Sequence, residues 1–457
     1  MIKLFNKLIS SQKKFFHTGV TRSYDFRIKA LDSLQKSILK FESSIYKALE
    51  KDLNKSAAET YLTEIGIALN EISFHKRHLK KWMKIKKVKS SLAQFPGKNY
   101  IYSEPYGLVL IIAPWNYPFH LCLLPLIGAI SSGNTVVIKP SEHSAQSSSV
   151  IAEIISSTFK SEYISVVQGS VDESTALLEE NFDYIFFTGS TQVGRIVMGA
   201  ASKNLTPLTL ELGGKSPVII DSSANISLAA KKVAFGKIIN AGQTCVAPDY
   251  LLIEESIEKQ FITQFETAVN KFFFEDKSKD AMVRIVNKKH YNRLKNLLKD
   301  GDIVFGGKFN DDENFIEPTL IKNVTLKSAI MKEEIFGPLL PIITYSNIEE
   351  AIEYVRNFNK PLSLYIFSQS KENIDRILKN CSFGGGCIND VLMQLTNPNL
   401  PFGGIGSSGF GSYHGKKSFD TFTHYKSIFK QSGFFDMPLR YPPYSENKLK
   451  LIKKILK

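Results

Sequence analysis

The stretch DYIFFTGSTQVG, Asp183–Gly194, decides the fold class of this chain. It opens with a continuous apolar run, which is typical of a strand buried on both faces of a parallel sheet. Glycine and serine then end the run, and a stretch with helical spacing follows. Two similar runs, LVLIIAP at Leu108–Pro114 and TVVIKP at Thr135–Pro140, also lead into helical stretches. Strands that alternate with helices predict a doubly wound α/β domain.

The same pattern starts again at Pro217. The strand PVIID precedes a helical stretch near 226–240, and the strand YLLIEE precedes a long helix at 256–274. Further strand–helix units continue to about residue 390, so we expect a second α/β domain. In front of the first strand, apolar residues at helical spacing predict three helices, at 2–15, 24–54 and 57–87. The predicted fold class is therefore α/β, with two doubly wound, Rossmann-like domains.

The net charge of the 457-residue chain is +14, from 58 basic and 44 acidic residues. Lysine is spread over the whole sequence and no nucleic-acid-binding motif occurs, so we expect solvated lysine-rich faces and no nucleic-acid partner. The N-terminus has neither the apolar core nor the cleavage site of a signal peptide. No run of about 18 apolar residues predicts a membrane-spanning helix.

The cysteine content indicates the compartment. The chain has four cysteines, Cys122, Cys245, Cys381 and Cys387. Four cysteines in a chain of this length do not suggest a disulfide framework, and no CxxC pair suggests zinc. We therefore expect free thiols, a reducing compartment such as the cytoplasm, and no metal site.

Two motifs at strand ends suggest a nucleotide site. Gly189–Gly194 reads GxTxxG between a strand and a helix, and a helix start attracts a pyrophosphate. In VIKPSE, Lys139 and Glu142 follow a buried strand, where ligands of open α/β sheets bind. Both motifs also have plain explanations, a strand–turn–helix connection and a charge pair on a surface loop.

Three motifs carry side chains suited to acyl chemistry. Cys245 in GQTCVAP is either a nucleophile or a buried core residue. Asn116 in PWNYP is either a rigid amide donor for an oxyanion or a residue that satisfies its own turn. Glu211 in ELGGKSP is either a base, with a pKa raised by apolar surroundings, or a helix-capping or ion-pair carboxylate.

Taken together, the motifs resemble a known family. PWNYP, VIKPSE, FTGSTQVG, ELGGKSP, GQTCVAP, EEIFGP and PFGGIGSSGFG occur in the order found in the NAD(P)-dependent aldehyde dehydrogenase superfamily, across positions 114 to 411. The segments FFHTGVTRSYDFR and LRYPP extend the match to nearly the whole chain. They resemble the class 3 branch, which includes the fatty aldehyde dehydrogenases.

The resemblance implies oxidation of an aldehyde to a carboxylic acid. Cys245 matches the nucleophile, which forms a thiohemiacetal and then a thioester. Asn116 matches the donor to the oxyanion, together with the Cys245 backbone N–H, and Glu211 matches the base that activates water. Two alternatives stay open. One is an acylating relative in which coenzyme A takes the thioester, and the other is a non-catalytic binding protein that reuses the fold.

The resemblance also implies the cofactor contacts. Lys139 and Glu142 match positions at the adenosine ribose. The remaining matches are Gly189, Ser190 and Gly194 at the pyrophosphate and Glu334 and Phe336 at the nicotinamide ribose. Glu142 favours NAD because a 2′-phosphate would meet a like charge. NADP stays open, since class 3 relatives often accept both.

The substrate and its pocket are less defined. Class 3 resemblance implies medium or long aliphatic aldehydes, or aromatic ones. Tyr117 and Thr244 flank the matched catalytic residues and are expected to line the substrate entrance. His414 in SYHG is either a part of that pocket or a structural histidine.

The expected domain division follows the family. Residues 1–88 and 108–210 match the NAD(P)-binding domain and 211–395 the catalytic domain. Residues 89–107 and 415–432 match a small β oligomerisation arm, which implies a homodimer. The basic tail 433–457 ends in SENKLKLIKKILK, in which Leu449, Ile452, Ile455 and Leu456 fall on one helical face. We interpret this tail either as a helix that rests on an anionic membrane, which would make the protein peripherally membrane-associated, or as a solvated or packed terminus.

Overall fold

The computed structural model describes residues 2–273 and 282–456, and its centre is a six-stranded sheet. In spatial order, the strands are β17 (Gly409–Phe410), β7 (Leu208–Leu212), β6 (Tyr184–Gly189), β3 (Leu108–Ile112), β4 (Thr135–Lys139) and β5 (Ile164–Val166). All neighbours are parallel except β17, which runs antiparallel to β7. The apolar runs of the sequence are thus the central strands of one sheet.

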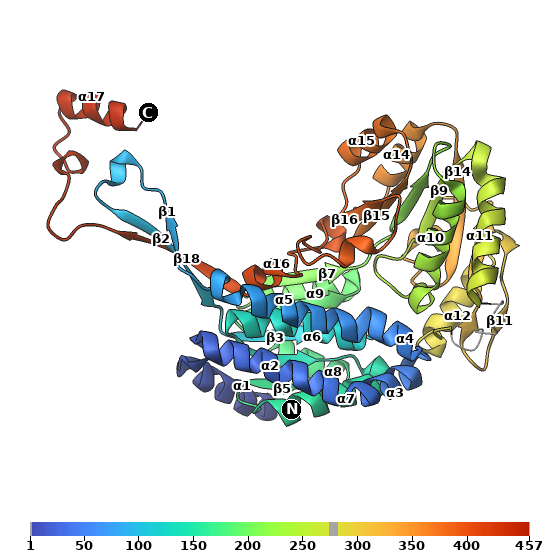
Figure 1. Cartoon of the computed structure of the whole chain (residues 1–457), viewed down its shortest axis with the longest axis horizontal. Coiled ribbons are helices and arrows are strands. Elements are labelled where there is room, and N and C mark those ends of the chain that lie inside the picture. The colour runs from blue at the N-terminus through green and yellow to red at the C-terminus, as the bar shows by residue number, and fades with distance from the viewer. Residues whose placement is uncertain (1, 274–281, 457) are drawn as a thin grey trace.

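Helices cover both faces of this sheet (Figure 1). One face packs on α2 (Tyr24–Lys40), α3 (Glu42–Leu53), α5 (Gly66–Trp82), α6 (Pro118–Ser132) and α7 (Ala145–Thr158). The other face packs on α1 (Ile2–His17), α8 (Val171–Leu178) and α9 (Thr191–Ser202). Along β3, Val109 and Ile111 belong to the first core, and Leu108 and Leu110 to the second. This two-sided burial explains why the strand has no polar alternation.

Two of the predicted helices have different bounds in the structure. The helix expected over 24–54 is two helices, because Phe41 leaves helical geometry between α2 and α3. The helix expected over 57–87 begins as α4 (Ala57–Thr60), passes through a π-helical turn at Tyr61–Ile65 and ends with α5 at Trp82. Apolar spacing continues across both irregularities, so periodicity alone did not reveal them.

A second sheet has seven strands. In spatial order, these are β10 (Asp302–Phe305), β13 (Thr319–Lys322), β14 (Leu339–Tyr345), β9 (Tyr250–Glu254), β8 (Pro217–Ile220), β15 (Ser363–Phe367) and β16 (Gly385–Ile388). Its helices are α10 (Ile226–Ile238), α11 (Glu258–Phe273), α12 (Lys288–Leu297), α13 (Ala329–Lys332), α14 (Ile348–Arg356) and α15 (Lys371–Asn380), and a small hairpin joins β11 (Phe309–Asn310) to β12 (Phe315–Ile316). Only β10 is antiparallel to its neighbour in this sheet. Two parallel-sheet units therefore confirm the predicted α/β class.

A three-stranded antiparallel sheet, here called the arm, projects from the body of the molecule (Figure 1). It consists of β1 (Lys86–Val88), β2 (Lys98–Pro105) and β18 (Thr423–Lys430). The arm begins at Lys86, inside the segment 1–88 expected in the first domain. Residues 416–421, expected in the arm, instead form the helix α16 (Lys416–Thr421), which packs on α6.

The chain ends beyond the arm in the helix α17 (Glu446–Ile455), at the far left of Figure 1. None of its side chains is buried. Over residues 2–273 and 282–456, no helix combines the length and the apolar character that a bilayer crossing requires.

We expect the core of the second unit to be sensitive to cavities. Leu251 on β9 is fully buried, and Leu251→Ala should lower the free energy of unfolding by about 2–5 kcal/mol because it removes packed methyl groups and leaves a cavity. The matched variant Leu228→Ala, at an exposed position of α10, should change it by less than about 0.5 kcal/mol. Denaturant unfolding of both variants measures the difference, and equal losses would contradict this assignment of the core.

Candidate active site

The predicted site residues meet at one edge of the first sheet. Asn116 follows β3, Lys139 ends β4 and Gly189 ends β6. Glu211 is the second-last residue of β7. These strands are parallel, so their carboxyl ends share one side of the sheet. Glu211, expected to open the catalytic domain, therefore belongs to a strand of the first sheet. Open α/β sheets bind their ligands at this edge.

Cys245 comes from the second unit and sits in a strained turn. The three residues Asn240, Ala241 and Gly242 all have left-handed backbone angles, with φ of 53°, 51° and 69°. A Cβ at Gly242 would collide with the carbonyl oxygen of Gly337, so only glycine fits there. Strain of this kind persists only where the surroundings hold it in place, and such strain is typical of functional sites.

Hydrogen bonds from both units hold this turn. The Gln243 side chain donates to the carbonyls of Asn240 (3.1 Å) and Arg284 (3.0 Å) and accepts from the Val286 N–H (3.1 Å). The Asn240 backbone N–H donates to the Glu59 carboxylate at 2.8 Å. The turn is thus tied to the first unit as well as to its own.

Asn116 and Tyr117 bring the first unit directly against the turn. The Asn116 amide nitrogen donates to the Gln243 carbonyl at 2.9 Å, and the Asn240 amide donates to the Asn116 carbonyl at 2.8 Å. The Tyr117 hydroxyl and the Thr244 Oγ1 are 2.7 Å apart. The structure therefore places Asn116, Tyr117 and Thr244 around Cys245, and the second N–H of Asn116 is left for a ligand.

A buried ion pair fixes the position of Asn116 and Tyr117. Lys55 (1% exposed) and Glu64 (0% exposed) form a 2.7 Å ion pair. The other Glu64 oxygen accepts the backbone N–H groups of Phe119 (2.9 Å) and His120 (3.1 Å) at the start of α6. The Lys55 ammonium also lies 4.4 Å from the centre of the Tyr117 ring. A carboxylate at a helix N-terminus and a cation over an aromatic face are both favourable.

Glu211 is buried without a hydrogen-bonding partner. It is 2% exposed, and neither carboxyl oxygen has a hydrogen bond among the described residues. Burial raises the pKa of Glu211 well above the ordinary carboxylate value. The raised pKa brings the exchange of a proton by this carboxyl closer to neutral pH than it is for an exposed carboxylate.

The Cys245 thiol, half-buried, lies in the same electrostatic environment. Burial raises its pKa above the ordinary thiol value, and the Glu334 and Glu211 carboxylates raise it further. The backbone N–H groups of Cys245 and Val246 act in the opposite direction as donors to the sulfur. The resting thiol is therefore protonated at neutral pH, and it becomes a nucleophile as its proton leaves.

Sequence reasoning missed Tyr413, Lys55 and Glu64. Burial raises the pKa of Tyr413, and Glu211 and Cys245 both add to the shift, which places its hydroxyl near both groups. Tyr413 stands next to His414 in the SYHG motif, and that was the available signal. Lys55 lies between two helices and nine residues before Glu64, so nothing in the sequence marked them as a buried pair.

The residues matched to the adenosine and pyrophosphate also lie at this edge. The buried Lys139 ammonium donates to the Pro140 carbonyl at 2.8 Å, and the Glu142 carboxylate is 3.8 Å away. Burial lowers the pKa of Lys139, and Glu142 partly opposes this. Ser190 caps the start of α9, its Oγ accepting the Val193 N–H at 3.3 Å. Gly194 lies where a Cβ would press on Leu212, so the helix packs closely on β7.

Glu334 and Phe336 reach the edge from the second unit. A Cβ at Gly213 would overlap the Glu334 carboxylate, so a glycine at this position makes room for Glu334. Burial raises the pKa of Glu334, and Asp249 adds to this. Phe336 has a left-handed φ of 50°, and its ring meets that of Trp115 edge-on, with the ring centres 5.5 Å apart.

These residues fit a dinucleotide. The Lys139 ammonium and the Glu142 carboxylate can hydrogen-bond ribose hydroxyls, and the start of α9 can receive a pyrophosphate. The Glu334 carboxylate can hydrogen-bond a second ribose. The missing side chain of Gly194 lets α9 pack closely on β7, and that of Gly213 makes room for the Glu334 carboxylate.

His414 is buried next to the rings of Phe402, Tyr413 and His120. Its ring stacks on Phe402 at 5.3 Å, and its Nε2 has no hydrogen bond among the described residues. The ring of His120 is 6.5 Å away, and its Nε2 is also unpaired within the described chain. Burial lowers the pKa of His414 to about 4 and that of His120 to about 3, so both rings are neutral at neutral pH.

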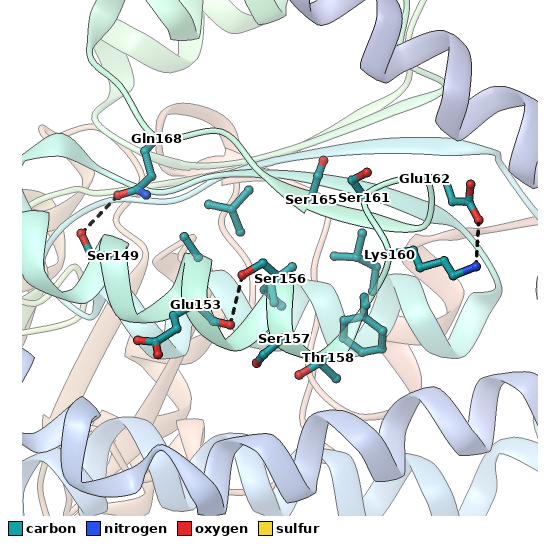
Figure 2. A pocket seen from close by; sticks show the side chains of 15 residues that line it. Ser149, Glu153, Ser156, Ser157, Thr158, Lys160, Ser161, Glu162, Ser165 and Gln168 are labelled. Atoms are coloured by element: carbon teal, nitrogen blue, oxygen red, sulfur yellow. Dashed lines mark hydrogen bonds and ion pairs between the residues drawn. The ribbon is translucent and has the colours of Figure 1, made fainter.

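A separate hollow lies between α7 and the edge strand β5, lined largely by serine and threonine hydroxyls (Figure 2). Ser149 contacts Gln168 across one end at 3.4 Å, and Lys160 lies 4.0 Å from Glu162 at the other. None of the residues discussed above lines it. The hollow is therefore not part of the candidate active site.

Comparison with known proteins identifies the family. Residues 4–428 match the aldehyde dehydrogenase family. The chain is 51% identical to the 4,4'-diaponeurosporen-aldehyde dehydrogenase of Staphylococcus aureus over 448 residues, or 97% of each protein. It is 42% identical to aldehyde dehydrogenase family 3 member B1 of Homo sapiens over 443 residues, which cover 96% of this chain and 95% of that protein.

A solved structure described as the substrate-bound state of Staphylococcus aureus AldH has a TM-score of 0.97 with this chain, at 50% identity and over 99% of both chains. These matches confirm the resemblance to class 3 enzymes. The chain belongs to the aldehyde dehydrogenase family and is an oxidoreductase that uses NAD or NADP to convert aldehydes to carboxylic acids.

Proposed function

We propose that Cys245 is the nucleophile, Asn116 the oxyanion donor and Glu211 the base of this oxidation. The observation that carries the proposal is the contact between the two units. The Cys245 turn of the second unit is hydrogen-bonded to Asn116 of the first, and Glu211 acts electrostatically on the thiol. A thiol, an amide donor and a neutral buried carboxyl around one point are the groups that acyl chemistry on an aldehyde requires.

The mechanism assigns one task to each side chain. The Cys245 thiol gives up its proton to water as the sulfur attacks the aldehyde carbon, and the product is a thiohemiacetal. The free N–H of Asn116 and the backbone N–H of Cys245 donate to the oxygen that becomes negative. NAD or NADP, when bound, supplies the hydride acceptor that turns the thiohemiacetal into a thioester. Glu211 then takes a proton from water, which attacks the thioester and releases the acid.

The cofactor contacts form part of the same proposal. Lys139 and Glu142 would hold the adenosine ribose, and the Glu334 carboxylate the nicotinamide ribose, with Phe336 beside it. Gly189, Ser190 and Gly194 would receive the pyrophosphate at the start of α9. The Glu142 carboxylate favours a free 2′-hydroxyl, so we propose a preference for NAD.

We propose medium- or long-chain aliphatic or aromatic aldehydes as substrates. The His414 ring contacts the aromatic rings of Phe402 and Tyr413, which supports an apolar pocket at this residue. The Staphylococcus aureus relative is named for 4,4'-diaponeurosporen-aldehyde, and similarity to it supports an apolar aldehyde here. A coenzyme A-dependent acyl transfer is the alternative, and the buried Glu211 favours hydrolysis over it.

We further propose a division of roles among the parts of the chain. The first unit, with boundaries moved to 2–82 and 108–212, binds the cofactor, and the second unit carries the nucleophile. The arm joins two copies into a homodimer, because β18 leaves a long exposed edge strand. The four free cysteines support a cytoplasmic location.

The tail suggests contact with an anionic membrane surface. In α17, Lys448, Lys450, Lys453 and Lys454 surround exposed leucines, and the exposed aromatic residues Phe434, Phe435, Tyr441 and Tyr444 precede it. Lysines with apolar and aromatic neighbours favour the headgroup region of a bilayer.

The nucleophile is tested by Cys245→Ser. We expect NAD(P)H formation over aldehydes of two to about sixteen carbons to rise with chain length in the wild type and to fall at least about 10³-fold in the variant, since the reaction loses its covalent step. Cys381→Ser, at a buried cysteine that follows α15, should keep its activity. Retained activity in Cys245→Ser would disprove the assignment, as would inactivity of the wild type with both cofactors.

The base is tested by the pH dependence of turnover. Only ionised Glu211 accepts a proton, and burial raises its pKa, so the steady-state rate should still be increasing with pH above the ordinary carboxylate pKa. Glu211→Gln should retain the first burst of NAD(P)H but slow turnover by about 10²–10⁴-fold, with the thioester accumulating. Glu258→Gln, at another buried carboxylate, is the control.

Stability gives an independent reading of the same group. A carboxyl whose folded pKa is raised contributes stability at low pH that is lost as pH rises above the unfolded value of about 4.3. Glu211→Gln should therefore raise the thermal midpoint at pH 8 but not at pH 4. An unchanged midpoint at pH 8 would mean that Glu211 is ionised without cost.

Membrane contact is tested by sedimentation with vesicles of phosphatidylcholine and phosphatidylserine. The full chain should co-sediment at low salt and less at high salt, because each lysine near the surface contributes about 1 kcal/mol. A chain ending at Glu446 should stay in solution. Equal, salt-insensitive sedimentation of the two would contradict the proposal, and an altered KM for long aldehydes alone would place the tail over the substrate entrance instead.

A further inference from the structure

A buried tyrosine of the second sheet is hydrogen-bonded to the turn that carries Cys245. Tyr365 lies on β15 and is 0% exposed. Its hydroxyl donates to the carbonyl of Val246 at 2.6 Å, and Val246 is the residue directly after Cys245. The contact joins strand β15 of the second sheet to the turn that carries the thiol.

The proton of this hydroxyl has a defined direction. The Gln394 amide nitrogen donates to the Tyr365 hydroxyl at 3.3 Å and to the Ser363 hydroxyl at 3.1 Å. The Gln394 amide oxygen accepts from the Cys387 thiol at 2.8 Å, which fixes which end of the amide faces Tyr365. Since the Tyr365 oxygen accepts from Gln394, its own proton points to the Val246 carbonyl.

Val246 matters because its backbone surrounds the sulfur. The Ala247 N–H donates to the Thr244 carbonyl at 2.9 Å, so Cys245 and Val246 are the two central residues of a tight turn. The N–H groups of both central residues belong to this turn and flank the Cα that carries the Cys245 thiol. A turn that rotates about Val246 would move these donors away from the sulfur and from any oxyanion beside it.

We propose that Tyr365, oriented by Gln394, is a positioning residue for the reaction: its bond to Val246 sets the direction of the backbone donors at Cys245. The proposal rests on Cys245 being the nucleophile, as proposed above. Tyr365 itself does not touch the substrate. It acts through one peptide carbonyl, and misplacement of reacting groups by about 1 Å can cost up to about 10²-fold in rate.

The chain contains a matched tyrosine for comparison. Tyr345 on β14 belongs to the same sheet, is 4% exposed and donates from its hydroxyl to the Ile220 carbonyl at 2.9 Å. Ile220 lies at the end of β8, outside the site. Tyr345→Phe and Tyr365→Phe therefore remove the same kind of buried hydrogen bond from the same sheet, and only the second bond ends on the Cys245 turn.

The experiment compares these two variants in the full chain. Both should show a similar small fall in thermal midpoint. Tyr365→Phe should lower kcat about 10-fold with little change in the KM for NAD. It should also shift the pH profile of Cys245 alkylation, followed by peptide mass spectrometry with iodoacetamide, upward by about one unit, or about tenfold in rate at a fixed pH. Tyr345→Phe should leave both unchanged.

Gln394→Met supplies a second route to the same answer. It should cause a smaller loss in the same direction, and combining it with Tyr365→Phe should add nothing. If Tyr365→Phe matches Tyr345→Phe in kcat and in alkylation profile, the proposal is wrong. If Tyr365→Phe does not fold, wild-type behaviour of Gln394→Met overturns it. Activity in Cys245→Ser would instead refute the assignment of the nucleophile, so the two failures are distinct.

Discussion

The ion pair between Lys55 and Glu64 is the interaction on which the arrangement of the site depends. It lies in the interior, where an unpaired charge costs several kcal/mol, so each partner requires the other. The Glu64 carboxylate also holds the first N–H groups of α6, and the loop before that helix carries Asn116 and Tyr117. The pair thereby converts the packing of the N-terminal helices into a fixed position for the residues that contact the Cys245 turn.

The thiol and the carboxyl that are proposed to react are both uncharged before the reaction begins. Burial keeps the Cys245 thiol and the Glu211 carboxyl neutral, and the nearby Glu334 acts in the same direction on the thiol. Neutral groups are cheaper to bury than charged ones, which lets apolar and aromatic residues close around them. In the proposed mechanism, charge appears on the sulfur, the oxyanion and the base only during the reaction, where the N–H donors are already in place.

Much of this could be predicted from the sequence, because the decisive patterns are local. Continuous apolar runs predicted the strands of both sheets. Short motifs predicted that Cys245, Asn116 and Glu211 belong to a site. What escaped was decided by contacts between distant residues. Phe41 breaks a helix without breaking its apolar spacing, and the arm begins at Lys86, within an expected helix. Lys55, Tyr413 and Tyr365 acquire their importance from partners far along the chain, and no spacing records such a partner.

The left-handed turn at Asn240, Ala241 and Gly242 has a consequence for how the molecule fails. The thiol is carried by one unit and its amide donor by the other, and the strained backbone between them is held by a few hydrogen bonds. A slight separation of the two units would let that turn relax while both sheets remain folded. We therefore expect activity to be lost through changes at the contact between the two units before either unit unfolds.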